Sequence, residues 1–144
     1  MKVIHLISGG DSGGAKTHVL SLLQHLNRTI TAQLVCFRDG PFAAEARSLG
    51  IPTMICGGNH IFKIRRRLAE YIRREGFQLI HCHGSRANMI GALLRRLTGL
   101  PVVTTIHSDY KIDYMGRPLA RCTFGVINTW ALRRLDYRVG VSDA

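Results

Sequence analysis

Short apolar runs alternate with helical patterns along the chain, and most of the runs end in polar or glycine residues. The runs are rich in Val, Ile and Leu, which is typical of strands buried on both faces of a sheet. They predict six strands, over residues 2–8, 31–37, 52–56, 77–83, 101–107 and 136–142. Apolar residues at helical spacing, with Pro and Gly as boundary signals, predict helices over 15–27, 41–50, 61–75, 86–98 and 118–135.

The alternation of strands and helices predicts the fold class. It is typical of a parallel sheet with helices on both faces. We therefore expect a single α/β, Rossmann-like domain over residues 1–144, with a doubly wound parallel six-stranded sheet in the order 3-2-1-4-5-6. Ligands bind such sheets beyond the carboxyl ends of the strands, where the strand order reverses. That rule selects the glycine-rich turn at 8–14, His83 and His107.

The turn SGGDSGG at 8–14 suits a phosphate or sugar oxygen, because glycine lets a ligand approach the backbone and a helix N-terminus follows. The alternative is that these glycines only make a tight turn. Two nucleotide-binding motifs fail to match. Asp11 and Ser12 stand where the dinucleotide fingerprint needs glycine, and Lys16 comes one residue too late for a P-loop.

Histidines and cysteines raise the question of a metal site. His81 and His83 flank Cys82, but neighbouring residues of a strand point to opposite faces of the sheet. We therefore predict no metal site and expect His81 to be a packing residue. The cysteines are widely spaced, with no CxxC pair, and are expected to be free buried thiols of a reducing cytosol: Cys36, Cys56, Cys82 and Cys122.

Four segments taken together resemble the N-terminal domain of GT-B glycosyltransferases, specifically the retaining family 4 (group 1) enzymes. They are KVIHLIS, GGAKTHVLSLLQHL, FQLIHCHGSRANMIGALLRRLTGLPVVTTIHSDY and the closing DYRVGVSDA. The resemblance implies a two-domain enzyme in which the N-terminal domain usually holds the acceptor and the C-terminal domain binds the nucleotide sugar. We expect that C-terminal domain to be absent from this chain, and the chain alone to be inactive.

The resemblance also implies roles for single residues. Gly13 and Gly14 match the glycine pair beside the donor phosphates, and His107 matches the histidine that faces the reacting sugar, which makes it the catalytic candidate. His83 matches a residue lining the cleft, and Ser142 matches a serine near the domain junction. Four further polar residues are candidates for the cleft and the acceptor: Lys16, Ser85, Arg86 and Asp109. Many relatives have Glu or Gln at the position of Lys16, so its role is open.

The implied activity is transfer of a sugar from a nucleotide sugar to a glycan or lipid-linked acceptor, with retention of the anomeric configuration. No metal and no cofactor are expected, since the nucleotide sugar is a substrate. Two alternatives stay open on the same fold, a sugar- or nucleotide-binding domain and a nucleotide-sugar epimerase. A second doubly wound domain beyond Ala144 would favour the transferase.

The charge is large and unevenly distributed. The chain has 20 Lys and Arg against 9 Asp and Glu, a net charge of +11, and residues 61–96 alone hold nine Lys or Arg and two Glu. Right-handed crossovers place this surplus on one face of the sheet, away from the glycine turn. The arginines that crowd it are Arg65, Arg66, Arg67, Arg73 and Arg74. A basic helical face favours an anionic membrane surface, although solvent or the partner domain could also cover it.

The sequence also argues against a nucleic-acid partner and against a transmembrane helix. No RNP-type aromatic pair, zinc motif or interleaving of basic and aromatic residues supports a nucleic-acid partner. No stretch approaches the roughly 20 apolar residues of a transmembrane helix. We expect a cytoplasmic protein that associates peripherally with the inner face of the membrane.

Overall fold

The computed structural model describes residues 1–10, 13–106 and 137–140. Four helices are described: α1 (Gly13–Leu26), α2 (Pro41–Ser48), α3 (Ile61–Glu75) and α4 (Ser85–Thr98). The strands are β1 (Lys2–Ile7), β2 (Thr31–Cys36), β3 (Thr53–Ile55), β4 (Leu79–His83), β5 (Val102–Ile106) and β6 (Tyr137–Gly140). The predicted helix over 118–135 and Cys122 lie outside the described residues.

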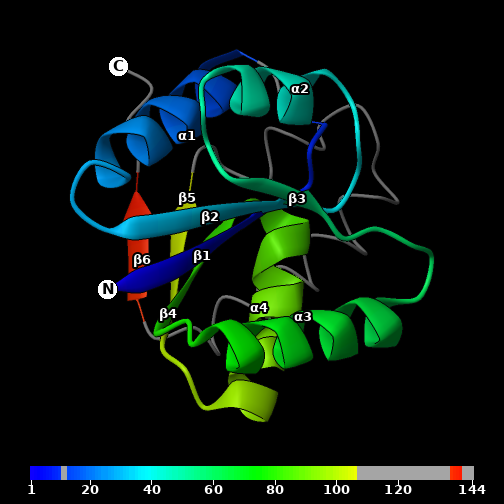
Figure 1. Ribbon diagram of the computed structural model, residues 1–144. Coiled ribbons are helices and arrows are strands. Elements are labelled where there is room, and N and C mark those ends of the chain that lie inside the picture. The colour runs from blue at the N-terminus through cyan, green and yellow to red at the C-terminus, as the bar shows by residue number, and fades with distance from the viewer. Residues whose placement is uncertain (11–12, 107–136, 141–144) are drawn as a thin grey trace.

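The strands form one parallel sheet (Figure 1). Its order is β3-β2-β1-β4-β5-β6, so the order reverses between β1 and β4. The predicted parallel α/β sheet is confirmed, with the order 3-2-1-4-5 for the first five strands. Beyond them, β6 pairs with β5 in parallel, Val103 lying opposite Tyr137.

Helices cover both faces of the sheet. Figure 1 shows α1 and α2 together above it and α3 and α4 below it. Two apolar clusters hold these layers. The cluster around Ile7, Leu23 and Phe42 packs α1 and α2 on the sheet, and the cluster around Leu6, Ile72 and Ile90 packs α3 and α4. Because Leu6 and Ile7 are neighbours in β1, their separation follows from the alternation of side chains along a strand.

Local signals set the ends of the helices. Pro41 is the first residue of α2, where its missing N–H costs nothing. Gly76 and Gly99 follow α3 and α4 with φ of 73° and 71°, the left-handed conformation that ends helices at low cost in glycine. The predicted strand 77–83 starts later, at Leu79. The reason is that the Phe77 N–H bonds the carbonyl of Ile72 at 3.1 Å and so belongs to the end of α3.

Three cysteines are described, Cys36, Cys56 and Cys82, and each is buried and outside any disulfide bond, as predicted. Burial raises the pKa of the Cys82 thiol far above its usual range, so this thiol stays protonated. Cys82 belongs to the cluster under α3 and α4, on the face opposite its neighbouring histidines. Among the described residues, no helix combines the length and the apolar character that crossing a bilayer requires.

The close approach of α4 to the sheet depends on Gly91. A Cβ at this position would collide with Sγ of Cys82 and lie 3.2 Å from Cγ1 of Val102. We expect Gly91→Ala to lower the free energy of unfolding by about 1–3 kcal/mol, because overpacking outweighs the better helix propensity of alanine. Urea unfolding measures this change.

The control places the same substitution in a Cys82→Ala background. Removing Sγ makes room for the new methyl group, so Gly91→Ala should then cost less, or even stabilise the fold. Additivity of the two changes within about 0.5 kcal/mol would contradict the contact.

Candidate functional site

Three strands end level at the carboxyl edge of the sheet. Ile7, the last residue of β1, lies opposite Cys36 of β2 on one side and His83 of β4 on the other. Because β1 is the strand at which the order reverses, the loops after these strands surround the point where doubly wound folds bind ligands. The glycine turn follows β1, and Gly84 follows β4.

The glycine turn is built on a close backbone approach. Gly9 has φ of 95°, and a Cβ there would collide with the carbonyl oxygen of Arg38. A Cβ on Gly10 would collide with the guanidinium of Arg38. Gly13 and Gly14 then open α1, two residues earlier than predicted, so they stand at the positive end of the helix dipole. Their contact with donor phosphates stays a prediction.

Arg38 is a residue that the sequence analysis missed. It follows β2 directly, is exposed, and lays its guanidinium against the glycine turn. The signal was present, because Arg38 is the first polar residue after a parallel strand, the position that pointed to the other edge residues. The charge surplus was predicted for residues 61–96 and not for this segment, so Arg38 adds a single cation beside the glycine turn.

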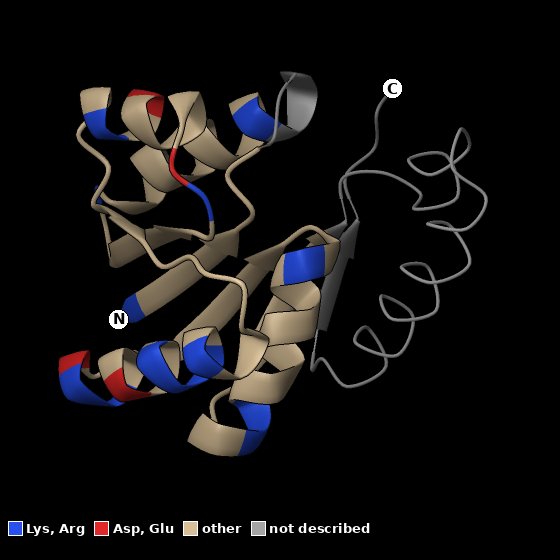
Figure 2. Cartoon of the chain, turned by 90° about the vertical axis from the view of Figure 1, so that its right-hand side faces the viewer, with Lys and Arg blue, Asp and Glu red and all other residues tan. Residues whose placement is uncertain are grey.

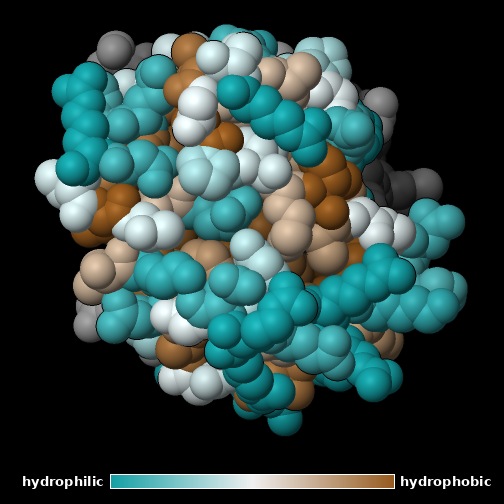
Figure 3. Space-filling view, in the orientation of Figure 1, coloured by the Kyte–Doolittle hydropathy of each residue, from teal (hydrophilic) through white to brown (hydrophobic). Residues whose placement is uncertain are grey.

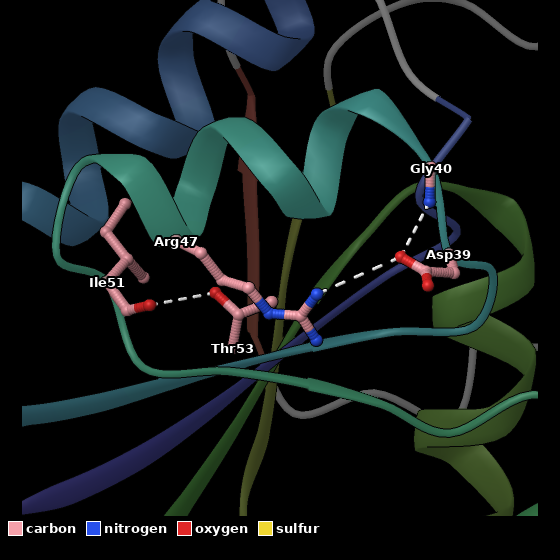
Figure 4. Close-up of polar contacts among 5 residues, drawn as sticks. All are labelled: Asp39, Gly40, Arg47, Ile51 and Thr53. Carbon is pink, nitrogen blue, oxygen red and sulfur yellow. Dashed lines mark hydrogen bonds and ion pairs between the residues drawn. The ribbon is translucent and has the colours of Figure 1, made fainter.

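The loop that carries Arg38 is tied to the start of α2 (Figure 4). The Gly40 N–H donates to Oδ1 of Asp39 at 2.9 Å, and Nη1 of Arg47 approaches the same oxygen at 4.0 Å. At the other end of α2, the Thr53 hydroxyl donates to the carbonyl of Ile51 at 2.9 Å. These short-range contacts anchor both ends of the segment between β2 and β3.

Two of the other predicted edge residues, Lys16 and Arg86, have definite partners. Lys16, in the first turns of α1, forms an ion pair with Glu45 of α2, so it joins the two helices. Ser85 is half-buried at the first position of α4. Arg86 is exposed, with its guanidinium carbon 5.7 Å from the centre of the Phe37 ring and Nη2 3.5 Å from the carbonyl of Gly58. Arg38 and Arg86 thus give the edge two cations.

Three histidines meet beneath this edge. The register places His5 opposite His81, and alternation puts His83 on the same face of the sheet. Their rings are stacked, with centroids 4.8 Å apart for His5 and His81, 5.3 Å for His5 and His83, and 4.4 Å for His81 and His83. The sequence analysis gave His5 no role. Only the pairing of β1 with β4 shows that it belongs with the other two.

Hydrogen bonds connect the histidine stack internally and to β5. Nδ1 of His5 lies 3.0 Å from Nε2 of His83, and Nε2 of His81 lies 2.6 Å from the hydroxyl of Thr105. His5 and His83 are buried, with 0% and 1% of their surfaces exposed. Burial lowers the pKa of His5 to about 3, with a further contribution from His81, so His5 is neutral at physiological pH.

The stack also brings together three imidazole side chains, a ligand type that transition metals accept. One ring nitrogen from each histidine lies within 4.8 Å of the others. The lone pairs of imidazole lie in the ring plane, however, and these planes are inclined by only 10–27° to one another. Binding of one ion by all three rings would therefore require the rings to turn out of this arrangement, and the absence of a metal site stays a prediction.

The predicted membrane-facing arginines lie on α3, on the opposite side of the sheet from α1 and α2. Beside them runs a groove of about 470 Å³, which α3 forms with the last turn of α4. Its lining includes Phe62, Lys63, Arg65, Arg66, Arg73 and Leu97. Three predicted site residues, His107, Asp109 and Ser142, lie outside the described residues.

The neutral state of His5 predicts how stability depends on pH. The unfolded chain protonates this residue near pH 6.5 and the folded chain near pH 3, so stability is lost as the pH falls between these values. From pH 7.5 to pH 5 the loss due to His5 is about 2 kcal/mol. We expect His5→Leu to remove that part of the pH dependence, as measured by urea unfolding at both values.

The matched control is His60→Leu, at an exposed position before α3. It should leave the pH dependence as in the unmodified chain. If the free energy of unfolding changed equally with pH in the His5 and His60 variants, His5 would not be held neutral in the folded chain.

Comparison with known proteins agrees with this geometry. The model of Glycosyltransferase Family 4 matches residues 12–144. The EpsF protein of Bacillus subtilis (strain 168) is 29% identical over 110 residues, which are 70% of this chain and 28% of EpsF. The UDP-Gal:alpha-D-GlcNAc-diphosphoundecaprenol alpha-1,3-galactosyltransferase of Escherichia coli is 26% identical over 88 residues, 56% of this chain and 23% of that enzyme. The chain thus spans less than a third of either relative.

Solved structures share the fold. Anabaena HepE, crystallised with UDP-glucose, matches with a TM-score of 0.71 over 100% of this chain and 44% of HepE, at 16% identity. Acinetobacter baumannii MurG matches with a TM-score of 0.69 over 99% of this chain and 41% of MurG, at 13% identity. The family model covers nearly the whole sequence, and these neighbours share the fold over 99–100% of this chain. This chain therefore belongs to glycosyltransferase family 4.

Proposed function

We propose that the chain is the N-terminal, acceptor-side domain of a retaining GT-B glycosyltransferase, and that residues 1–144 fold as this one domain. The family match over residues 12–144 carries the proposal. The level carboxyl edge of β1, β2 and β4 supports it, because loops at that edge can reach a ligand held against a second domain. The second, nucleotide-sugar-binding domain is required for turnover, so the chain alone is inactive.

The substrates follow from what the relatives bind. HepE was crystallised with UDP-glucose, and the Escherichia coli relative is named for a UDP-galactose donor and a diphosphoundecaprenol-linked acceptor. We infer a nucleotide sugar as the donor and a glycan or lipid-linked sugar as the acceptor. The nucleotide sugar is consumed as a substrate, and the proposal includes no metal and no organic cofactor.

The site residues have distinct roles in this proposal. Negative charge develops on the diphosphate leaving group, and hydrogen-bond donors and cations that face it lower the barrier. The backbone N–H groups of Gly13 and Gly14 act there, and the Arg38 guanidinium beside Gly10 adds a cation. Arg86, at the start of α4, meets an anionic acceptor in this proposal. His107 orients the transferred sugar by hydrogen bonding.

The test is transfer of labelled sugar from UDP-glucose or UDP-galactose to a polyprenyl-diphosphate-linked sugar, using the complete polypeptide that the gene encodes. We expect Arg38→Gln and His107→Ala each to lower kcat/KM by about 100-fold, which is typical of losing one donor to a developing charge. Steady-state kinetics with varied donor concentration measures both effects.

Arg28→Gln is the matched control for Arg38. Arg28 is an exposed arginine between α1 and β2, at the opposite edge of the sheet. Its loss should leave kcat/KM unchanged.

Unchanged turnover and donor KM in His107→Ala would remove His107 from the mechanism. Interconversion of the nucleotide sugar without an acceptor would favour the epimerase.

We propose in addition that α3 binds an anionic membrane surface, which would place the enzyme peripherally on the cytoplasmic face of the membrane. Lys and Arg crowd α3 and both ends of α4 in Figure 2, and hydrophilic side chains cover α3 in Figure 3. Phe62 is 64% exposed and Leu97 is 36% exposed at the groove. Cations around an exposed aromatic ring suit a headgroup region, where phosphates meet the start of the acyl chains.

Single contacts in the groove support this occupant. The guanidinium carbon of Arg65 lies 5.0 Å from the centre of the Phe62 ring, and its buried Nε has no hydrogen-bond partner. Arg66 pairs with Glu70 at 3.2 Å and Arg74 with Glu75 at 3.3 Å. α3 nevertheless carries six Lys or Arg against these two glutamates, so a net positive charge remains for lipid phosphates.

Vesicle co-sedimentation tests the membrane surface. The chain should sediment with phosphatidylglycerol vesicles at low salt, less so at high salt, and not with phosphatidylcholine alone. Lys63→Gln and Arg66→Gln should each lower the affinity about fivefold. Phe62→Ser should lower it by a similar factor through lost insertion.

Leu49→Ser and Arg47→Gln are the matched controls, because both residues are exposed at α2, on the other face of the sheet. They should leave binding unchanged. An equal loss of vesicle affinity in the α2 and α3 variants, or vesicle binding that does not depend on salt concentration, would exclude α3 as the docking surface.

A further inference from the structure

The hydrogen bonds of the histidine stack determine where its protons lie. Nδ1 of His5 and Nε2 of His83 are 3.0 Å apart, so one of these nitrogens donates and the other accepts. His5 is fully buried and neutral, and it therefore carries a single proton, on either Nδ1 or Nε2. The environment of its second nitrogen decides between the two.

Nε2 of His5 is buried and has no hydrogen-bond partner. A proton on Nε2 would leave an N–H group orphaned in the interior, whereas a proton on Nδ1 leaves only an unused lone pair. Orphaned N–H groups are the rarer of the two in proteins. The proton of His5 therefore lies on Nδ1 and is donated to Nε2 of His83.

This assignment fixes the tautomer of the second ring. Because Nε2 of His83 accepts, a neutral His83 carries its proton on Nδ1. His81 also packs against the His83 ring, with ring centres 4.4 Å apart and planes inclined by 10°, and so limits its rotation. His81 in turn lies 2.6 Å from the hydroxyl of Thr105, which is opposite His83 on β5. Contacts from β1 and β4 thus meet at the His83 ring, and β5 contacts its neighbour His81.

We propose that His5 is a positioning residue, which holds His83 as a neutral Nδ1–H donor of fixed direction at the carboxyl edge of the sheet. Arg38 and Arg86 already supply positive charge at this edge. A buried neutral donor can hold a backbone carbonyl at this edge without the desolvation cost of a third cation. The importance of this edge for catalysis rests on the proposed function, but the tautomer does not.

A metal centre is the rival explanation of the same cluster. Ligation of one ion by all three rings would need a lone pair on one nitrogen of each ring. An ion bound between Nδ1 of His5 and Nε2 of His83, which lie 3.0 Å apart, would displace the proton that they share. The two explanations therefore exclude each other, and they predict different spectra.

Long-range ¹H–¹⁵N correlation spectra of the histidine-labelled chain test the proposal at pH 7.5. Nδ1 should be the protonated nitrogen in both His5 and His83. His5→Asn places an amide nitrogen where Nδ1 was and should keep His83 in this tautomer. His5→Gln places the amide at the position of Nε2, and His5→Leu has no donor. Both should release His83 to a mixture of tautomers.

Three results would overturn the assignment. They are a protonated Nε2 on His83 in the unmodified chain, a His83 spectrum unchanged in His5→Leu, and binding of one Zn²⁺ per chain that His5→Asn abolishes. The last result would establish the metal centre instead. Circular dichroism of each variant separates these outcomes from unfolding.

Kinetics of the complete polypeptide connect the tautomer to catalysis. His5→Leu should lower kcat about tenfold with little change in donor KM, and His5→Asn should restore most of it, as expected for a partner that orients a functional histidine. If His5→Leu released the Nδ1–H tautomer of His83 but left kcat unchanged, the positioning role would be excluded and the proposed function would be unaffected. Absence of transfer by the unmodified enzyme would contradict the proposed function and leave the tautomer assignment standing.

Discussion

The register of β1 between β2 and β4 is the constraint on which the other features depend. A side-chain period of two means that a slip of one residue would exchange the two faces of the strand. Leu6 would then leave the cluster under α3 and α4, and His5 would leave its place opposite His81. The same register brings Ile7 level with Cys36 and His83, and so determines which loops meet at the carboxyl edge.

Much of this arrangement could be predicted from local sequence. Apolar runs gave the strands to within one or two residues, and Gly76 and Gly99 ended their helices because left-handed backbone is cheapest in glycine. Parallel topology then pointed to residues directly after strands, which is why Gly9 and His83 could be nominated. These features depend on local sequence patterns and on the rule that ligands bind doubly wound sheets at the carboxyl ends of their strands.

What the sequence could not reveal depends on pairing between distant segments. Residues 5 and 81 are far apart in the chain, and no local pattern shows that they are opposite each other. The guanidinium of Arg38 reaches Gly10 because the loop after β2 folds back over the turn after β1, and Lys16 finds its acidic partner on another helix. Each of these contacts depends on side-chain reach across neighbouring elements rather than on sequence period.

A hydrogen bond from a side chain of α3 joins that helix to the end of α4. Nη2 of Arg73 donates to the carbonyl of Leu97, in the last turn of α4. One arginine of the basic face thus acts as an internal tie that joins the helices. α4 begins at Ser85, two residues after the end of β4. The hydrogen bond of Arg73 and the length of α4 therefore connect α3 to the carboxyl edge of the sheet. The groove beside α3 and the edge of the sheet that holds His83 therefore lie at the two ends of one helix, α4.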